Sequence, residues 1–112
     1  MKVGRTFYFD ASHHLPKYEG KCERFHGHTY QLDVVVEGEV GKEGMVLDFT
    51  KLGNIVEEEV LEKLDHEDLN KVIKNPSAEN IVEWIWEKLE GKLSICSVRV
   101  YEGRGKWAEK TK

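Results

Sequence analysis

The five histidines are the residues of this sequence best suited to chemistry, and all of them lie between positions 13 and 66. Two belong to the run His26-Gly27-His28, and side chains at alternate positions of a strand point to the same face. Two imidazoles on one face supply half of a zinc site. A third ligand is expected from His13 or His14, and His13 continues the apolar side of the preceding strand. Three histidines and one open position are typical of catalytic zinc; two surface imidazoles without a metal are the alternative.

Two further groups near these histidines are capable of proton transfer. Cys22 lies four residues before His26, and a thiol near a metal or an imidazolium has a lowered pKa, which makes it a usable base or nucleophile. In the pair Asp65-His66, a carboxylate can orient an imidazole for acid–base work. The alternatives are an ordinary loop cysteine and a histidine that interacts favourably with the C-terminal end of a helix dipole.

Glu102 is an acidic residue on the otherwise apolar face of its expected strand, because it falls on the same side as Val98 and Val100. It either lies at the strand end in water or accepts hydrogen bonds from a buried ligand. A carboxylate that accepts two parallel N–H bonds matches a guanidine-like edge, such as that of a pterin or guanine. The residues alone leave both possibilities open.

Composition limits the class of protein that carries these groups. The 112 residues suit one domain, residues 1–112, without repeats or linkers. The net charge of -4 argues against a nucleic-acid partner, which usually requires a basic surplus. No apolar run has the length of a membrane helix, and the N-terminus lacks the apolar stretch of a signal peptide, so we expect no membrane partner and a cytoplasmic location. Two cysteines do not make a disulfide framework.

Hydrophobic periodicity predicts the elements that position the histidines. Strands are expected over Val3–Ala11, Thr29–Glu37 and Leu93–Glu102, with a short last strand over Lys106–Glu109. Helices are expected over Asp48–Leu64, with Asp48 or Thr50 as N-cap, and over Ala78–Leu89 after the start signal Asn75-Pro76-Ser77. The segment Asp65–Asn75 between the helices is expected to be a loop.

The expected order is strand, strand, helix, helix, strand, strand. This pattern predicts an α+β fold with an antiparallel sheet of about four strands and two helices on one face. The other face of the sheet then meets solvent or another subunit.

Several spaced motifs together resemble the 6-pyruvoyl-tetrahydropterin synthase family, which includes the bacterial 6-carboxy-tetrahydropterin synthases of queuosine biosynthesis. They occur in the order of the family and cover almost the whole chain: Phe9-Asp10-Ala11-Ser12-His13-His14-Leu15-Pro16, Cys22-x-x-x-His26-Gly27-His28-x-Tyr30, Gly44-Met45-Val46-Leu47-Asp48-Phe49, Leu64-Asp65-His66-x-x-Leu69-Asn70, Asn75-Pro76-Ser77-Ala78-Glu79-Asn80 and Val98-x-Val100-x-Glu102.

The resemblance implies a role for each matching residue. It implies that the zinc ligands are His13, His26 and His28, that Cys22 is the proton-abstracting base, and that Asp65 and His66 form the acid–base pair. It further implies that Glu102 anchors the pterin and that the segment around Ser77 also grips the ring. Ser77 stands where the family usually has threonine, a change that keeps the hydroxyl.

The family also implies an assembly and a reaction. Its members adopt the tunnelling fold, in which strands of three subunits close a barrel and two trimers stack into a hexamer with active sites between subunits. The implied activity is that of a lyase acting on 7,8-dihydroneopterin triphosphate. The products are 6-carboxy-tetrahydropterin, acetaldehyde and triphosphate in the queuosine branch, or 6-pyruvoyl-tetrahydropterin in the biopterin branch.

Glu23, directly after Cys22, opens an alternative reaction. Some relatives use a glutamate in the pattern Glu-x-x-His-Gly-His and cleave the side chain to 6-hydroxymethyl-dihydropterin for folate synthesis. The run Cys22-Glu23-Arg24-Phe25-His26-Gly27-His28 resembles a dual subgroup credited with both reactions, whereas a solvated loop glutamate is the plainer interpretation. A non-catalytic pterin or zinc-binding module and a structural zinc protein are the competing functions.

Overall fold

Two long antiparallel strands, β1 (Lys2–His13) and β2 (His26–Glu37), form the centre of the protein in the computed structural model. The structure describes residues 1–15 and 26–112 and, for His26, only its place in the strand. Both strands extend beyond their predicted ranges, and β2 begins at His26 rather than Thr29. Because β2 begins earlier than predicted, His26 and His28 both lie within the strand and pair with residues of β1.

Three further strands complete the sheet, in the order β3-β1-β2-β4-β5. Strands β4 (Ile95–Glu102) and β5 (Trp107–Thr111) are antiparallel to their neighbours, as predicted. Strand β3 (Glu67–Asp68) pairs parallel with β1. The prediction of about four antiparallel strands is therefore wrong: the sheet is mixed and has five strands. A two-residue strand is too short to show an alternating pattern, so hydrophobic periodicity did not predict it.

The first helix runs over the predicted region in three consecutive segments: α1 (Phe49–Val56), the π-helical turn η2 (Glu57–Leu61) and α2 (Glu62–Leu64). Asp48 is the N-cap and accepts a hydrogen bond from the backbone N–H of Thr50 at 3.0 Å. Phe49, the first helical residue, is 54% exposed although it is apolar.

The second predicted helix is confirmed as α3 (Ala78–Leu89), with Ser77 as its N-cap. A 3-10 turn, η3 (Leu69–Lys71), lies in the segment that was expected to be a loop. Within the described residues, no helix is both long and apolar enough to cross a membrane.

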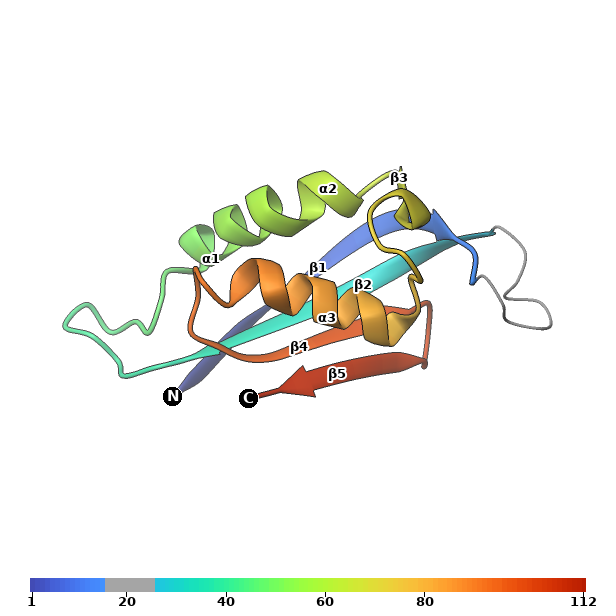
Figure 1. The fold of residues 1–112 in the computed structure, drawn as a ribbon. Helices are drawn as coiled ribbons and strands as arrows, with labels where there is room; N and C mark the ends of the chain where they lie inside the picture. The colour runs from blue at the N-terminus through green and yellow to red at the C-terminus, as the bar shows by residue number, and fades with distance from the viewer. Residues whose placement is uncertain (16–25) are drawn as a thin grey trace.

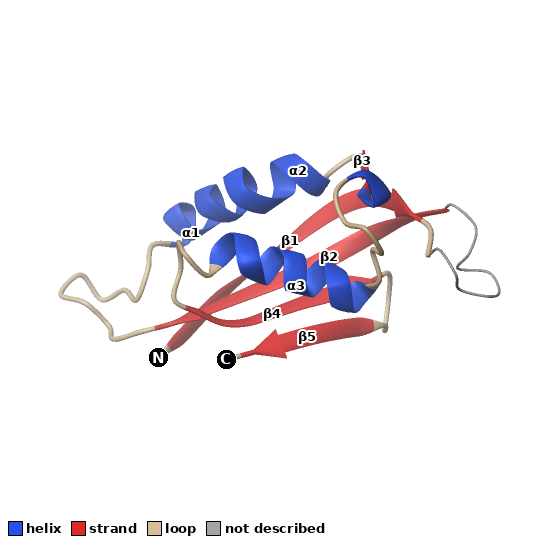
Figure 2. Cartoon of the chain, in the orientation of Figure 1, coloured by secondary structure: helices blue, strands red, loops and turns tan. Residues whose placement is uncertain are grey.

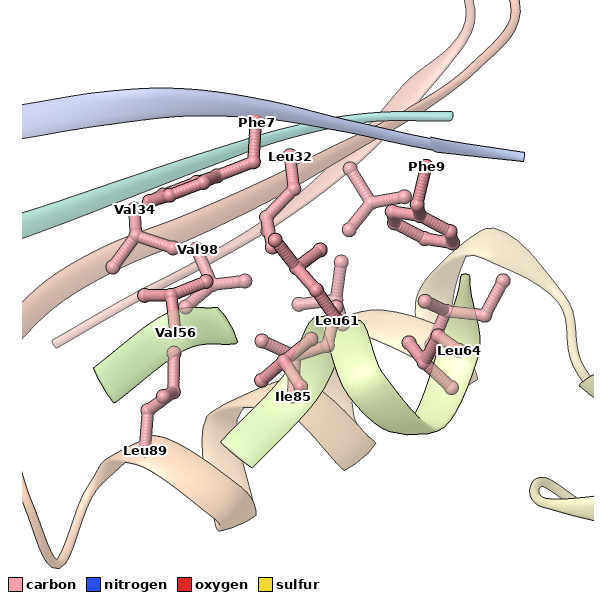
Figure 3. Close-up of a cluster of buried hydrophobic side chains, with 14 of the residues drawn as sticks. Phe7, Phe9, Leu32, Val34, Val56, Leu61, Leu64, Ile85, Leu89 and Val98 are labelled. Carbon is pink, nitrogen blue, oxygen red and sulfur yellow. The ribbon is translucent and has the colours of Figure 1, made fainter. Parts of the chain in front are cut away.

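Both helices cover the same face of the sheet, and the hydrophobic core lies between the two layers (Figure 1, Figure 2). Side chains from β1, β2 and β4 meet those of the helices in this layer (Figure 3). The π-helical turn buries two consecutive residues, Val60 and Leu61. No helix among residues 1–15 and 26–112 covers the opposite face of the sheet (Figure 1), and Tyr8 on it is 64% exposed.

Gly4 in β1 provides a test of how tightly the central strands pack. A Cβ atom at this position would lie 2.9 Å from the carbonyl oxygen of Val34 and 3.2 Å from Cγ2 of Val35. Because the carbonyl oxygen belongs to the backbone and cannot rotate away, we expect Gly4→Ala to lower the free energy of unfolding by about 1–3 kcal/mol. Gly91→Ala is the control, since a Cβ there meets nothing within 4 Å. Chemical denaturation compares them, and equal stabilities would contradict the expected packing.

Candidate active site

The candidate site lies at one end of the sheet, where apolar positions on the helix-covered face give way to polar ones. In β1 the buried series Phe7, Phe9 and Ala11 ends at His13, which is itself fully buried. In β4 the series Val98 and Val100 ends at Glu102, as its parity predicted. The termini lie at the opposite end of the sheet (Figure 1). The regular alternation of the strands therefore delivers polar side chains to the edge of the hydrophobic layer.

Three of these side chains converge into a set of possible metal ligands. Nε2 of His28 lies 3.2 Å from Oε1 of Glu102, and Nε2 of His13 lies 3.8 Å from the same oxygen. The two imidazole rings are 5.0 Å apart and nearly perpendicular, at 79°. One ligand atom from each of the three residues falls within 4.8 Å of the others. Imidazole nitrogens and a carboxylate are donors that zinc accepts, so the residues present fit a divalent metal.

A backbone contact sets the orientation of His13. Its Nδ1 lies 2.8 Å from the carbonyl oxygen of Pro76, the residue before the N-cap of α3. A carbonyl oxygen only accepts, so Nδ1 is the donor in this contact, which leaves Nε2 of the neutral tautomer with the lone pair. Metal-binding histidines commonly have this arrangement, in which the outer nitrogen donates to the protein and the inner one binds the ion.

The register of β1 and β2 adds His26 to this end of the sheet. His26 is the cross-strand partner of His13, and Ala11 is the partner of His28. Directly opposed positions of an antiparallel pair share a face. Cys22 and Glu23 lie outside the described residues.

Tyr30 belongs to the site although its role was not predicted. It is fully buried, its ring stacks on Phe9 at 5.0 Å, and it meets the rings of His13 and His28 edge-on. Burial, and next the negative charge of Glu102, raise the pKa of Tyr30, so the phenol stays neutral. Its hydroxyl makes no hydrogen bond with any described residue. The signal was available in the sequence, because Tyr30 continues the alternation of His26 and His28.

Asp65 and His66 come together at the end of the first helix, as their adjacency suggested. Oδ1 of Asp65 lies 3.1 Å from Nδ1 of His66. The backbone of His66 has a φ of 60°, a left-handed conformation that is uncommon for residues other than glycine. A carboxylate beside an imidazole can fix its tautomer and support proton transfer at the other nitrogen.

An open pocket of about 540 Å³ joins the two groups. It lies between the ends of β1, β2 and β3, and both His28 and His66 line it. A small molecule in this pocket would meet His28, a member of the first group, and His66, a member of the second.

Ser77 caps α3, as the start signal Asn75-Pro76-Ser77 predicted. Its hydroxyl accepts a hydrogen bond from the backbone N–H of Asn80 at 3.2 Å and caps α3. The neighbouring Pro76 contacts His13, so the start of α3 lies beside the histidines.

Comparison with known proteins finds relatives of this chain in one recognised family. A family model described as 6-pyruvoyl tetrahydropterin synthase matches residues 2–112. The dihydroneopterin monophosphate aldolase of Pyrococcus furiosus is 44% identical over 99 residues, covering 85% of this chain and 83% of the relative. The 6-carboxy-5,6,7,8-tetrahydropterin synthase of Synechocystis is 40% identical over 109 residues, covering 89% and 84%.

The fold is also that of a solved structure. The Caenorhabditis elegans 6-pyruvoyl tetrahydropterin synthase superposes with a TM-score of 0.89 at 27% sequence identity, covering all of this chain and 95% of the other. The agreement extends over the whole sheet and both helices, so it includes every element that contributes a described residue to the candidate site.

Proposed function

Because this chain belongs to the 6-pyruvoyl tetrahydropterin synthase family, we propose that it converts 7,8-dihydroneopterin triphosphate to 6-carboxy-5,6,7,8-tetrahydropterin, acetaldehyde and triphosphate, as in queuosine biosynthesis. Release of 6-pyruvoyl-tetrahydropterin is the biopterin-type variant of the same reaction. The observation that carries the proposal is the convergence of His13, His28 and Glu102 beside Asp65 and His66, along a pocket that His28 and His66 share.

The proposed zinc ligands are His13, His26 and His28. Two facts support them. Nε2 of His13 and Nε2 of His28 lie 3.8 Å and 3.2 Å, respectively, from Oε1 of Glu102, and the strand register sets His26 opposite His13. Bound there, zinc supplies a Lewis acid for the oxygen atoms of the substrate side chain. The contact of His13 with the Pro76 carbonyl holds one imidazole in the orientation that this requires.

Proton transfer is assigned to three residues of the chain. Cys22 takes the proton from carbon, in accordance with the family motif that it matches. His66 moves protons on and off the side-chain oxygens, and Asp65, 3.1 Å away, holds the imidazole in the required tautomer.

The pterin ring is assigned to Glu102 and to the segment around Ser77. The carboxylate of Glu102 can accept two parallel N–H bonds from the guanidine-like edge of the ring. Its partial exposure leaves it accessible to a ligand, and it is the only acid at the end of β4. Ser77 contributes through the start of α3, which its hydroxyl caps.

Side-chain cleavage to 6-hydroxymethyl-7,8-dihydropterin for folate synthesis is the second candidate reaction. A specific observation favours it: a 44% identical relative is named dihydroneopterin monophosphate aldolase. In this reaction Glu23 is the proposed base. Cys22 and Glu23 are adjacent in the sequence. The synthase reaction requires Cys22 as the base, whereas cleavage requires Glu23.

Product analysis separates these reactions. Zinc-loaded protein is incubated with 7,8-dihydroneopterin triphosphate, and products are identified by mass spectrometry for the unmodified protein, Cys22→Ala and Glu23→Ala. Loss of 6-carboxy-tetrahydropterin in Cys22→Ala alone supports the synthase. Formation of 6-hydroxymethyl-dihydropterin that depends on Glu23 supports cleavage. Pterin binding without any turnover would indicate that the protein is a non-catalytic binding module.

Removal of the metal is expected to stop turnover while much of the fold remains. The reason is that the described core, from Phe7 to Val100, is one continuous hydrophobic cluster that includes none of the proposed zinc ligands. Circular dichroism and activity are measured together after chelation and again after zinc is restored. Unfolding that parallels the loss of activity would indicate a structural zinc protein instead.

We further propose that the protein assembles into the hexamer of the tunnelling fold, with two stacked trimers. The uncovered sheet face supports this, since it exposes Tyr8 and leaves Trp107 51% exposed. Light scattering measures the mass directly, and a monomer at micromolar concentration would contradict the assembly.

A further inference from the structure

Asp10 lies at the junction of three strands beside the proposed acid–base pair. It is in β1, its cross-strand partner in β2 is Thr29, and its neighbour Ala11 pairs with Glu67 of β3. Residues Asp65 and His66 come immediately before β3. Asp10 is therefore the point at which the sheet can fix the loop that carries the pair.

The backbone of Asp10 binds both members of the pair. Its N–H donates to Oδ1 of Asp65 at 3.0 Å, and its carbonyl accepts from the N–H of His66 at 2.6 Å. The same Asp65 oxygen faces Nδ1 of His66. These two bonds hold His66 in its left-handed backbone conformation and fix the direction in which its imidazole leaves the chain.

The side chain of Asp10 is fixed in turn by Thr29. The Thr29 hydroxyl donates to Oδ1 of Asp10 at 2.5 Å. One carboxylate oxygen of Asp10, one of Asp65 and a ring nitrogen of His66 all lie within 4.8 Å of one another. The imidazole is thus flanked by two carboxylates, one adjacent in sequence and one delivered by the sheet.

We infer that Asp10, held by Thr29, is a positioning residue for His66: it fixes the imidazole in the geometry for proton transfer without contacting the substrate. The inference rests on the proposed function, because it takes His66 to be the proton carrier. The Asp65–His66 pair is then supported by Asp10 of β1 and Thr29 of β2, in addition to its own loop.

The same two strands contain a matched control. Thr6 and Asp33 form an equivalent cross-strand pair, with the Thr6 hydroxyl 2.7 Å from Oδ1 of Asp33, away from the histidines. If Asp–Thr pairs serve only to hold the strands together, substitutions at the two pairs will have the same effect. If Asp10 positions His66, only one pair will affect catalysis.

The kinetic test uses the full-length, zinc-loaded protein. We expect Asp10→Asn to lower kcat about 10-fold or more with KM within about twofold, since it removes part of a general acid–base contribution of 10²–10⁴. Thr29→Val is expected to lower kcat and Thr29→Ser to restore it, whereas Asp33→Asn and Thr6→Val leave it unchanged. In a His66→Gln background, Asp10→Asn should cause no further loss. A full additional loss in that background, or equal effects at both pairs, would overturn the inference.

The ring signals of His66 in NMR spectra provide a readout that is independent of turnover. Asp10→Asn should change their chemical shifts, and Asp33→Asn should not. If the shifts move but the unmodified protein makes no pterin product, the proposed function fails and the positioning contact stands. If the protein is active and Asp10→Asn leaves both the shifts and kcat unchanged, the positioning role fails and the proposed function stands.

Discussion

His28→Ala is expected to remove most of the bound zinc and to lower pterin turnover at least about a thousandfold. Of the three proposed zinc ligands, His13 and His28 have side chains that the structure describes, and Nε2 of His28 lies 3.2 Å from Glu102. Two remaining protein ligands are fewer than the three typical of catalytic zinc. Metal content is measured by atomic emission after dialysis, and turnover by the product assay.

A second histidine variant separates metal binding from proton transfer. His66→Gln should also lower turnover, by about 10²–10⁴-fold, but it should retain zinc, because His66 belongs to the other side of the pocket. Full zinc occupancy in His28→Ala would contradict the ligand assignment. Loss of zinc in His66→Gln would indicate that the two groups form one metal site rather than a metal site and an acid–base pair.

Glu102→Gln is expected to weaken pterin binding by about 10²–10³-fold while zinc content stays near normal. The substitution keeps the shape of the side chain but removes the charge that strengthens two parallel N–H bonds. Calorimetry or fluorescence titration with a dihydropterin lacking the phosphorylated side chain measures the loss, since this probe isolates the ring from the rest of the substrate.

The same experiment distinguishes two roles of Glu102, pterin binding and metal binding. Its carboxylate lies 3.2 Å from Nε2 of His28, a distance equally suited to a neighbouring metal ligand. A large fall in zinc content with unchanged pterin affinity would assign it to the metal instead. Glu109→Gln is the control: it removes a carboxylate of β5 that pairs with Arg99, and it should change neither quantity.

The features predicted best from the sequence are those that depend on local periodicity. Val98, Val100 and Glu102 alternate in β4 as expected, and the parity that carries His13 to the buried side of β1 is the one that the structure has. The helix caps at Asp48 and Ser77 were found because a capping side chain leaves a sequence signal within two or three residues. Each of these features is decided by neighbours along the chain.

The features that were missed depend on contacts between distant segments. Strand β3 exists because Glu67 and Asp68 meet β1, and the φ of His66 is held by the carbonyl of Asp10, 56 residues away in the chain. The π-helical turn contains Val60 and Leu61, which are both buried in the core. Tyr30 differs from these features, because its place in the alternation of His26 and His28 could have assigned it to the site from the sequence.

The bond between His13 and the Pro76 carbonyl couples the metal site to the beginning of a helix. Pro76 immediately precedes the N-cap of α3, so fraying of the first turn would release the imidazole from its fixed orientation. Coupling of this kind is reciprocal: an ion that favours the fixed imidazole also opposes fraying, by the same free energy. Amide hydrogen exchange at the start of α3 should therefore slow when the ion is bound, and brief local opening of that turn becomes a route for its escape.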